Sequence, residues 1–447
     1  MLKKISSLSL MLLVFLTLTS CGSRQTLLFL NWGEYIDETL LDAFEELYDC
    51  NVVMDLGESN EIFYSKVRGG TTVYDVVCPS DYMVEKMYMN DMLSEIDFNQ
   101  LPSFDEDNVR VGVNKIYDDM NTNLKNMKSD YVDGTINNYF VPYLWGTWGI
   151  MYTTLKDGLE DAVTKSDNEW SSLFDRSKLP NGTKVAMYDS YNHDYYAACR
   201  YLGYDPHTEL ADSKLNEIRN LVAKMKYDAW GTDSIKKDIV AGNIDLGYMW
   251  TGDFLYYYAE CAADVTTNCY INGDVDLDGM ADMLDILTSD ERIYKANGNE
   301  YQIGFDLFIP SDTVAFCDNL VITKDASNKD LAHKFIDFMI SGSVEVNEEE
   351  LNPAFTNTYY VDYDAPYIST YTELTELTET EFTEDLLEDF SKSGYEDSTL
   401  YWSIYDYVIG KSFLKYYELN GTKGNILATF DRKYVNKINT AFNNART

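Results

Sequence analysis

The chain has 447 residues and carries 75 acidic against 35 basic side chains, which gives a formal net charge of −40. A surface of this sign repels nucleic acid and anionic lipid headgroups and concentrates cations around it, so nucleic acid is excluded as a partner. The length is sufficient for two lobes of ordinary size.

The first twenty residues predict an export signal. Lys3 and Lys4 precede an apolar run of roughly a dozen residues, which is short for a membrane span. Cys21 follows a Leu-x-Ser end that resembles the lipobox of bacterial lipoproteins, in which the cysteine becomes the new N-terminus and carries a diacylglycerol. We therefore expect a lipoprotein signal peptide at 1–20 and a lipidated Cys21 that anchors the chain to the extracytoplasmic face of the cell membrane. The alternative is an ordinary signal peptide with a chance cysteine.

Short apolar runs alternate with helical patterns after Thr26. Strands are predicted at 27–30, 52–56 and 76–78, and helices from about Asp37, over 60–68 and from about Tyr82. This order is typical of a parallel sheet wrapped by helices, in which ligands bind outside the carboxyl ends of the strands. Those ends fall at 31–35 and 79–82, and both segments are polar and aromatic where an ordinary turn would hold Gly, Asn or Asp.

A second α/β stretch follows in the rest of the chain. Strands are predicted at 184–188, 245–250 and 320–323, and helices at 215–225, 329–340, near 402–418 and at 432–442. The acidic run 372–388 repeats Thr-Glu-Leu and predicts a solvated amphipathic helix.

Five motifs occur in order along the chain. They are L-N-W-G-E-Y at 30–35, Y-D-V-V-C-P-S-D-Y at 74–82, P-Y-L-W-G at 142–146, D-L-G-Y-M-W-T-G-D at 245–253 and F-C-D-N-L-V-I at 316–322. Together they resemble the bacterial spermidine/putrescine-binding proteins of polyamine ABC importers. The resemblance implies an α/β, two-lobed periplasmic-binding-protein fold of type II-like topology, with a hinge between the lobes. The expected lobes are 26–145 with 319–360, and 146–318 with 361–447.

The resemblance also implies a cleft that holds a di- or polyammonium chain between aromatic rings. An alkyl chain packs on flat apolar walls, and each ammonium pairs with a carboxylate or a ring face. Carried over residue by residue, the aromatic walls are Trp32, Tyr35, Tyr82, Trp250 and Phe316. The carboxylates are Glu34, Asp253 and Asp318, with Ser80 as a hydrogen-bonding neighbour.

The second lobe departs from the family pattern. Ser190 and His193 replace family carboxylates, which leaves Asp189 and Asp194 as candidates to substitute for them. Because part of the far end of a spermidine site is lost, a shorter diamine is as good a candidate ligand as spermidine.

The expected function is therefore that of an extracytoplasmic substrate-binding lipoprotein that delivers putrescine or spermidine to an ABC permease and its ATPase subunit. Ferric iron is an alternative, because some clamps of this fold bind it through paired tyrosines and Tyr195-Tyr196 and Tyr359-Tyr360 occur in the chain. Another small solute and calcium-dependent extracellular adhesion are further alternatives. An enzyme is not expected, because G-x-S-x-G and H-E-x-x-H are missing from the sequence.

A segment at 262–300 has no counterpart in the family. It places aspartates at the EF-hand loop positions 1, 3, 5, 9 and 12, with Gly279 at position 6, and it also resembles one dockerin repeat. The predicted metal ligands are Asp274, Asp276, Asp278, Asp282 and Asp285. We expect a structural Ca²⁺ in this loop, and the alternative is an acidic surface loop. Cys261 and Cys269, which are close in sequence, are candidates for a disulfide.

Overall fold

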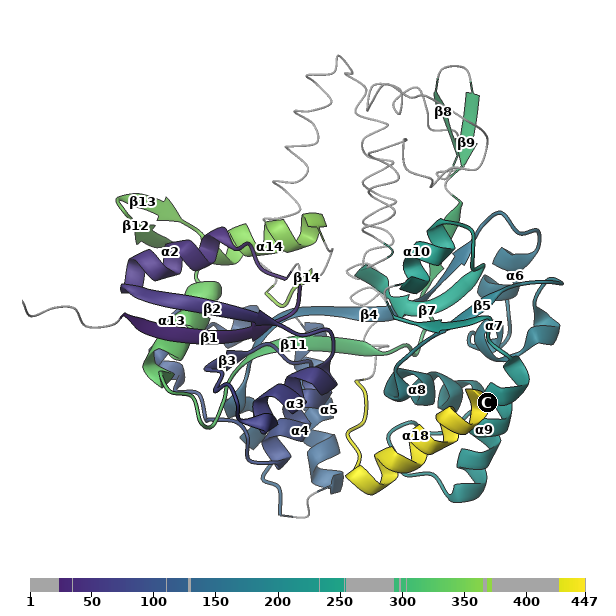
Figure 1. Ribbon diagram of the computed structural model, residues 1–447, viewed down its shortest axis with the longest axis horizontal. Coiled ribbons are helices and arrows are strands. Elements are labelled where there is room, and N and C mark those ends of the chain that lie inside the picture. The colour runs from purple at the N-terminus through teal and green to yellow at the C-terminus, as the bar shows by residue number, and fades with distance from the viewer. Residues whose placement is uncertain are drawn as a thin grey trace, which may run out of the picture.

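The centre of the molecule is a mixed sheet of ten strands. The computed structural model describes residues 24–33, 35–109, 111–127, 130–232, 234–252, 254, 293–296, 299–302, 304–364, 368–371 and 426–446. The sheet has the order β2 (Cys50–Leu56), β1 (Gln25–Asn31), β3 (Val76–Val77), β11 (Ala315–Ile322), β4 (Val141–Thr153), β7 (Leu246–Trp250), β5 (Val185–Tyr188) and β6 (Ala229–Gly231). The strands β10 (Phe305–Phe308) and β14 (Ile368–Ser369) also pair with β4. Figure 1 shows helices packed around each half of this sheet, with β4 and β11 running between the halves.

The N-terminal part of the chain forms a parallel unit covered by helices. Its elements are β1 (Gln25–Asn31), α2 (Thr39–Tyr48), β2 (Cys50–Leu56), α3 (Asn60–Gly69), β3 (Val76–Val77) and α4 (Asp81–Met89). The parallel pairing of β1 with both β2 and β3 brings the carboxyl ends of these strands to one edge. At the start of α3, the Ser59 hydroxyl caps the helix by accepting a hydrogen bond from the Ile62 N–H. The predicted order of elements is confirmed in this region.

The strand β4 (Val141–Thr153) was not predicted as a strand. All 13 of its residues are buried, so it lacks the alternation of apolar and polar residues by which a half-exposed strand is recognised. It pairs antiparallel with β11 (Ala315–Ile322) along its first half, and with β7 (Leu246–Trp250) and β10 (Phe305–Phe308) along its second half. A single strand therefore belongs to both halves of the molecule.

The second half of the molecule is also built on parallel strands. Its elements include β5 (Val185–Tyr188), α8 (Tyr191–Leu202), α9 (Asp212–Met225), β6 (Ala229–Gly231) and α10 (Ser234–Val240). β5 is parallel to β6 and β7, so the carboxyl ends of these three strands share an edge. The C-terminal helix α18 (Arg432–Arg446) packs on α8 and α9, and its Tyr434 hydroxyl lies 3.0 Å from that of Tyr195.

The remaining helices and strands complete the two halves. They are α5 (Val111–Met127), α6 (Leu159–Thr164), α7 (Ser171–Phe174), β8 (Ile293–Ala296), β9 (Asn299–Gln302), α13 (Lys329–Met339), β12 (Val344–Val346), β13 (Glu349–Leu351), α14 (Pro353–Asp364) and β14 (Ile368–Ser369). Among the described residues, no helix combines the length and the hydropathy that a membrane span requires. The predicted helix near 402–418 and the acidic run 372–388 lie outside the described residues.

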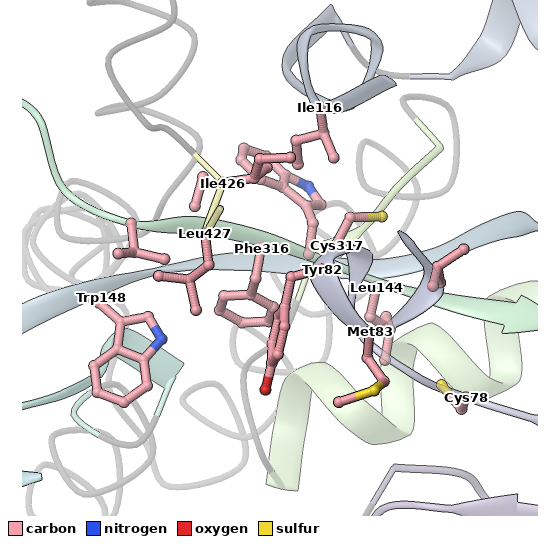
Figure 2. Packing of buried hydrophobic residues seen from close by; sticks show 14 of the residues in the cluster. Cys78, Tyr82, Met83, Ile116, Leu144, Trp148, Phe316, Cys317, Ile426 and Leu427 are labelled. Atoms are coloured by element: carbon pink, nitrogen blue, oxygen red, sulfur yellow. The ribbon is translucent and has the colours of Figure 1, made fainter. Parts of the chain in front are cut away.

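Two features bear on the predicted lobes. The strand expected at 320–323 begins earlier, at Ala315, because the buried run 315–322 pairs continuously with β4 apart from one shift in register. The segment 426–431 leads into α18 but also reaches the first half, where the Thr429 hydroxyl donates to the Tyr82 carbonyl at 3.0 Å. Figure 2 shows Ile426 and Leu427 of this segment near Tyr82 and Phe316. The lobe boundaries themselves stay a prediction.

Candidate ligand-binding site

The side chain of Asp318 forms hydrogen bonds with two other predicted site residues, Ser80 and Tyr35. Asp318 lies inside β11 rather than before it, where the register against β4 shifts between Asp318 and Asn319. Only 4% of the residue is exposed. Its Oδ1 accepts a hydrogen bond from the Ser80 hydroxyl at 2.5 Å, and its Oδ2 accepts one from the Tyr35 hydroxyl at 2.6 Å. Segments that are far apart in sequence thus meet at one carboxylate.

Asn60 is a member of this network that the sequence analysis did not identify. Its Nδ2 donates to the Ser80 hydroxyl oxygen at 2.8 Å, and its Oδ1 accepts from the Ser80 N–H at 3.0 Å. Because Asn60 fills an acceptor position of the Ser80 hydroxyl, the hydroxyl proton is directed at Asp318. Ser59 already caps α3, so the neighbouring Asn60 is left for the site. In the sequence, a second polar residue directly after a helix-capping serine was the feature that could have indicated a role for Asn60 in the site.

The segment that follows β1 is held in place by β4 and α14. The Tyr143 hydroxyl of β4 donates to the Tyr35 carbonyl at 2.9 Å. Asn357 of α14 donates to that same hydroxyl at 2.5 Å and accepts from the Asp37 N–H at 3.1 Å. Tyr35 is therefore fixed at its backbone as well as at its hydroxyl.

Two buried carboxyl groups at the site have raised pKa values. Burial raises the pKa of Asp318 to about 6, while the hydrogen bonds from Ser80 and Tyr35 act in the opposite direction. Burial also raises the pKa of Asp81 to about 8, against the hydrogen bonds that it accepts from the Cys317 and Tyr82 N–H groups. The negative charge of Asp318 raises it further. A cation that reaches Asp318 would favour its ionised form.

Aromatic rings lie next to this carboxylate. Phe316 is two residues before Asp318, and its ring meets that of Trp250 edge-on at 4.5 Å between centroids. Trp250 also packs on Trp148 at 4.3 Å. Figure 2 shows the Tyr82 ring beside that of Phe316. The structure thus brings the predicted walls Tyr82, Phe316 and Trp250 into one buried region.

The predicted wall residue Trp32 has a different environment. Its ring packs on Phe63 of α3 at 4.5 Å between centroids, and its indole N–H donates to the Cys78 carbonyl at 2.8 Å. Trp32 is only partly buried, so one part of the ring stays accessible. It lies at the end of β1, between the site segment and α3.

Several predicted residues lie outside the described residues. They are Glu34 and Asp253 of the ligand site, Cys21, Cys261 and Cys269, and the loop aspartates Asp274, Asp276, Asp278, Asp282 and Asp285. Their assignments stay predictions.

The two candidate acids of the second lobe differ in their surroundings. Asp189 forms an ion pair with Arg446 at 2.6 Å, and the Arg446 guanidinium lies 3.9 Å from the centroid of the Trp230 ring. Asp194 is completely buried, and among the described residues neither of its carboxyl oxygens has a hydrogen-bond partner. Burial holds the pKa of Asp194 well above its usual range. Neither group offers a free carboxylate to a ligand.

His193, which stands where the family has a carboxylate, is part of the core. Its ring stacks on Trp148 at 3.8 Å, and its Nδ1 lies 2.8 Å from the Ser190 hydroxyl. Burial lowers the pKa of His193 to about 3, so the ring is neutral at physiological pH. It therefore adds no positive charge that would oppose a cationic ligand.

The first tyrosine pair proposed for iron is used for packing. The Tyr195 hydroxyl contacts that of Tyr434 at 3.0 Å, and the Tyr196 hydroxyl donates to the Asp312 carbonyl at 2.8 Å. The side chains of Tyr359 and Tyr360 lie outside the described part of the chain. Within that part, no group of three or more His, Cys, Asp or Glu side chains is placed to hold a metal ion.

Comparison with known proteins supports the same class of protein. A family model described as hypothetical lipoprotein (MG045 family) matches residues 1–189. The chain is 26% identical over 343 residues to a putrescine/cadaverine-binding protein of Pseudomonas aeruginosa. The aligned region covers 74% of this chain and 80% of that protein. It is 28% identical over 237 residues to a spermidine/putrescine-binding periplasmic protein of Escherichia coli, and this aligned region covers 51% of this chain and 59% of that protein.

Solved structures with the same fold cover nearly the whole chain. A spermidine/putrescine ABC transporter protein from Listeria monocytogenes superimposes with a TM-score of 0.58 at 23% identity, over 95% of this chain and 99% of that one. The TpPotD lipoprotein of Treponema pallidum gives a TM-score of 0.56 at 18% identity, over 94% of this chain and 99% of that one.

The fold is that of the two-lobed periplasmic binding proteins, as expected. Within this class, the chain is similar in sequence to the bacterial putrescine- and spermidine-binding proteins, so the resemblance based on the five motifs is confirmed. These relatives are named as binding proteins, which agrees with the expectation that the chain is a binder rather than an enzyme.

Proposed function

We propose that this protein is the extracytoplasmic substrate-binding subunit of an ABC importer and that it captures a polyamine, putrescine or spermidine. The observation that carries the proposal is the buried Asp318 carboxylate, held by Ser80 and Tyr35 beside the ring of Phe316. In the described part of the chain, no lysine or arginine forms an ion pair with it. The relatives that bind putrescine, cadaverine or spermidine support the choice of ligand.

The site chemistry suits an ammonium group joined to an alkyl chain. A charge-assisted hydrogen bond between an ammonium and a carboxylate is worth about 1.5–3 kcal/mol. Aromatic faces add cation–π attraction of about 0.5–2 kcal/mol and provide flat surfaces for methylene groups. The rings of Tyr82 and Trp250 lie beside that of Phe316, which is two residues before Asp318 in β11. Hinge closure of the two lobes would then enclose the ligand for delivery to the permease and its ATPase.

Isothermal titration calorimetry on the mature chain tests this function. We expect putrescine or spermidine to bind with micromolar or tighter affinity, about −8 kcal/mol or more favourable. Ferric citrate and a panel of sugars serve as competing ligand classes. Absence of heat for putrescine, cadaverine, spermidine and spermine would refute the polyamine assignment, and binding of another class would replace it.

We also propose that the protein is held at the outer face of the membrane by a lipid on Cys21. The lipobox-like sequence and the match of residues 1–189 to a lipoprotein family support this anchor. Mass spectrometry of the native protein should find a diacylglycerol adduct on Cys21. Cys21→Ala should shift the chain from the membrane fraction, and unchanged partitioning would refute the anchor.

The loop from Asp274 to Asp285 is proposed to hold one structural Ca²⁺, on the basis of its EF-hand spacing. The ion would stabilise the inserted segment without contributing to ligand capture. Calcium titration followed by limited proteolysis should show protection of 262–300 with unchanged putrescine affinity. Equal cleavage rates with calcium and with a chelator would argue against the site.

A further inference from the structure

Glu61 lies in the first turn of α3, directly after the site residue Asn60. Its Oε1 is 3.5 Å from the hydroxyl of Tyr82, whose ring lies beside that of Phe316. The side chain is partly buried, so it is neither hidden in the core nor freely solvated. Glu61 is therefore a carboxylate at the border of the ligand site, next to Asn60 in sequence and to Tyr82 in space.

The charge of Glu61 also acts on a residue of the second half of the molecule. Tyr191, the first residue of α8, is close enough that the Glu61 charge adds to burial in raising the pKa of its hydroxyl. The same two causes, burial first and Glu61 next, raise the pKa of Tyr82. One carboxylate thus lies near a tyrosine from each half, which is the arrangement that an ammonium enclosed between the lobes requires.

Among the described residues, the hydroxyl of Tyr82 is the hydrogen-bond partner of this carboxylate. In the described part of the chain Glu61 forms no ion pair. The cation whose pKa responds to Glu61 is Lys86, whose ammonium lies 4.5 Å from the centroid of the Tyr64 ring. A partly buried carboxylate that forms no ion pair with Lys86 can accept an external cation.

Two acids of the second lobe, Asp189 and Asp194, are poorly placed for this role. Asp189 is neutralised by Arg446, which also covers the Trp230 ring. Asp194 is completely buried, and its environment favours the protonated form. Apart from the predicted carboxylate Asp253, which lies outside the described residues, a second ammonium therefore has to be met by a carboxylate from another part of the chain.

We propose that Glu61 is a second ammonium-binding carboxylate, which receives the far end of a diamine whose first ammonium is bound by Asp318. The rings of Tyr82 and Tyr191 lie beside this second ammonium. Glu61 then determines the preference for a diamine over a monoamine of the same length. This inference rests on the proposed function and assigns a specificity-determining residue to it.

The test compares Glu61→Gln with the matched control Glu58→Gln. Both variants remove one negative charge from the same turn, but Glu58 is exposed and Glu61 is partly buried beside Tyr82. Glutamine at position 61 keeps an acceptor for the Tyr82 hydroxyl, so local packing is preserved. Putrescine binding is measured by calorimetry, and 1-aminobutane binding by competition with putrescine. Melting temperatures verify that each variant is folded.

We expect Glu61→Gln to weaken putrescine binding by at least about tenfold and to leave 1-aminobutane unchanged, while Glu58→Gln changes neither by more than about twofold. Equal putrescine affinities for the two variants would overturn the role of Glu61. Equal losses for putrescine and 1-aminobutane in Glu61→Gln would also overturn it, because the effect would not concern the second ammonium. Failure of the unmodified protein to bind any polyamine would instead refute the proposed function itself.

Discussion

At the residue scale, recognition of a cation depends most on Asp318. Its two oxygens are oriented by Ser80 and Tyr35, and Asn60 orients Ser80 in turn. An ammonium would therefore meet a carboxylate that is already in its bound geometry. Such preorganisation limits the conformational entropy lost on binding.

Asp318→Asn keeps the shape of the side chain and removes its charge. We expect it to weaken putrescine binding at least tenfold, about 1.4 kcal/mol, because the ammonium loses its charged acceptor. The melting temperature of the free protein should not fall, since burial disfavours the charge that the substitution removes and both hydroxyl partners can reorient toward an amide. Asp325→Asn is the control, because Asp325 is exposed just beyond the same strand. Equal calorimetric affinities for the two variants would place the cation site elsewhere.

The raised pKa of Asp318 predicts a pH dependence of binding. In the free protein this group is ionised above its pKa of about 6 and protonated below it. Since only the carboxylate attracts an ammonium, affinity should be nearly constant above about pH 7 and should fall by up to about tenfold per pH unit well below 6. Calorimetry at a series of pH values measures this slope. A slope that is the same in Asp318→Asn would show that another group is responsible.

The predicted and the missed site residues differ in the type of information they required. Tyr35, Ser80 and Asp318 lie within motifs shared with a family, and the structure brings all three together. Asn60 and Glu61 lie outside those motifs, and their roles depend on how α3 packs against the segment before α4. The engagement of Asp189 by Arg446 could not be predicted either, because it depends on where α18 ends in space.

At the scale of elements, β4 links the two halves and tolerates little change. Gly149 lies in its middle, between β7 and β10. A Cβ atom there would be 2.7 Å from a Leu307 methyl carbon and 3.2 Å from the Phe308 carbonyl oxygen. The sequence suggested no strand at this position, because complete burial removes the alternating pattern and because glycine is uncommon within strands.

Gly149→Ala should destabilise the protein by about 1–3 kcal/mol, since the neighbouring backbone oxygen cannot move aside as a side chain would. Gly342→Ala is the matched control, because no atom lies within 4 Å of a Cβ atom at that position. Urea denaturation of the two variants and the unmodified chain gives the comparison. If the midpoint for Gly149→Ala equals that for Gly342→Ala, the packing around β4 is looser than the structure indicates.

At the scale of the whole molecule, strong negative charge and a buried site act on different steps of binding. The chain carries a net charge of −40, so its field draws polyamines from a distance. Mobile ions screen that field over about 10 Å at 0.1 M salt, whereas contacts inside a closed site are screened much less. Long-range attraction therefore affects association, and the contacts with Asp318 affect dissociation.

Stopped-flow measurements of putrescine binding can separate these two contributions. Raising NaCl from about 20 mM to about 300 mM should slow association several-fold and leave the dissociation rate nearly unchanged, because only the exposed charges are screened. Asp318→Asn should have the converse effect, with faster dissociation and a similar salt dependence of association. If salt accelerated dissociation as strongly as it slowed association, the ammonium would be bound by exposed carboxylates, and the buried position of Asp318 would not be the source of affinity.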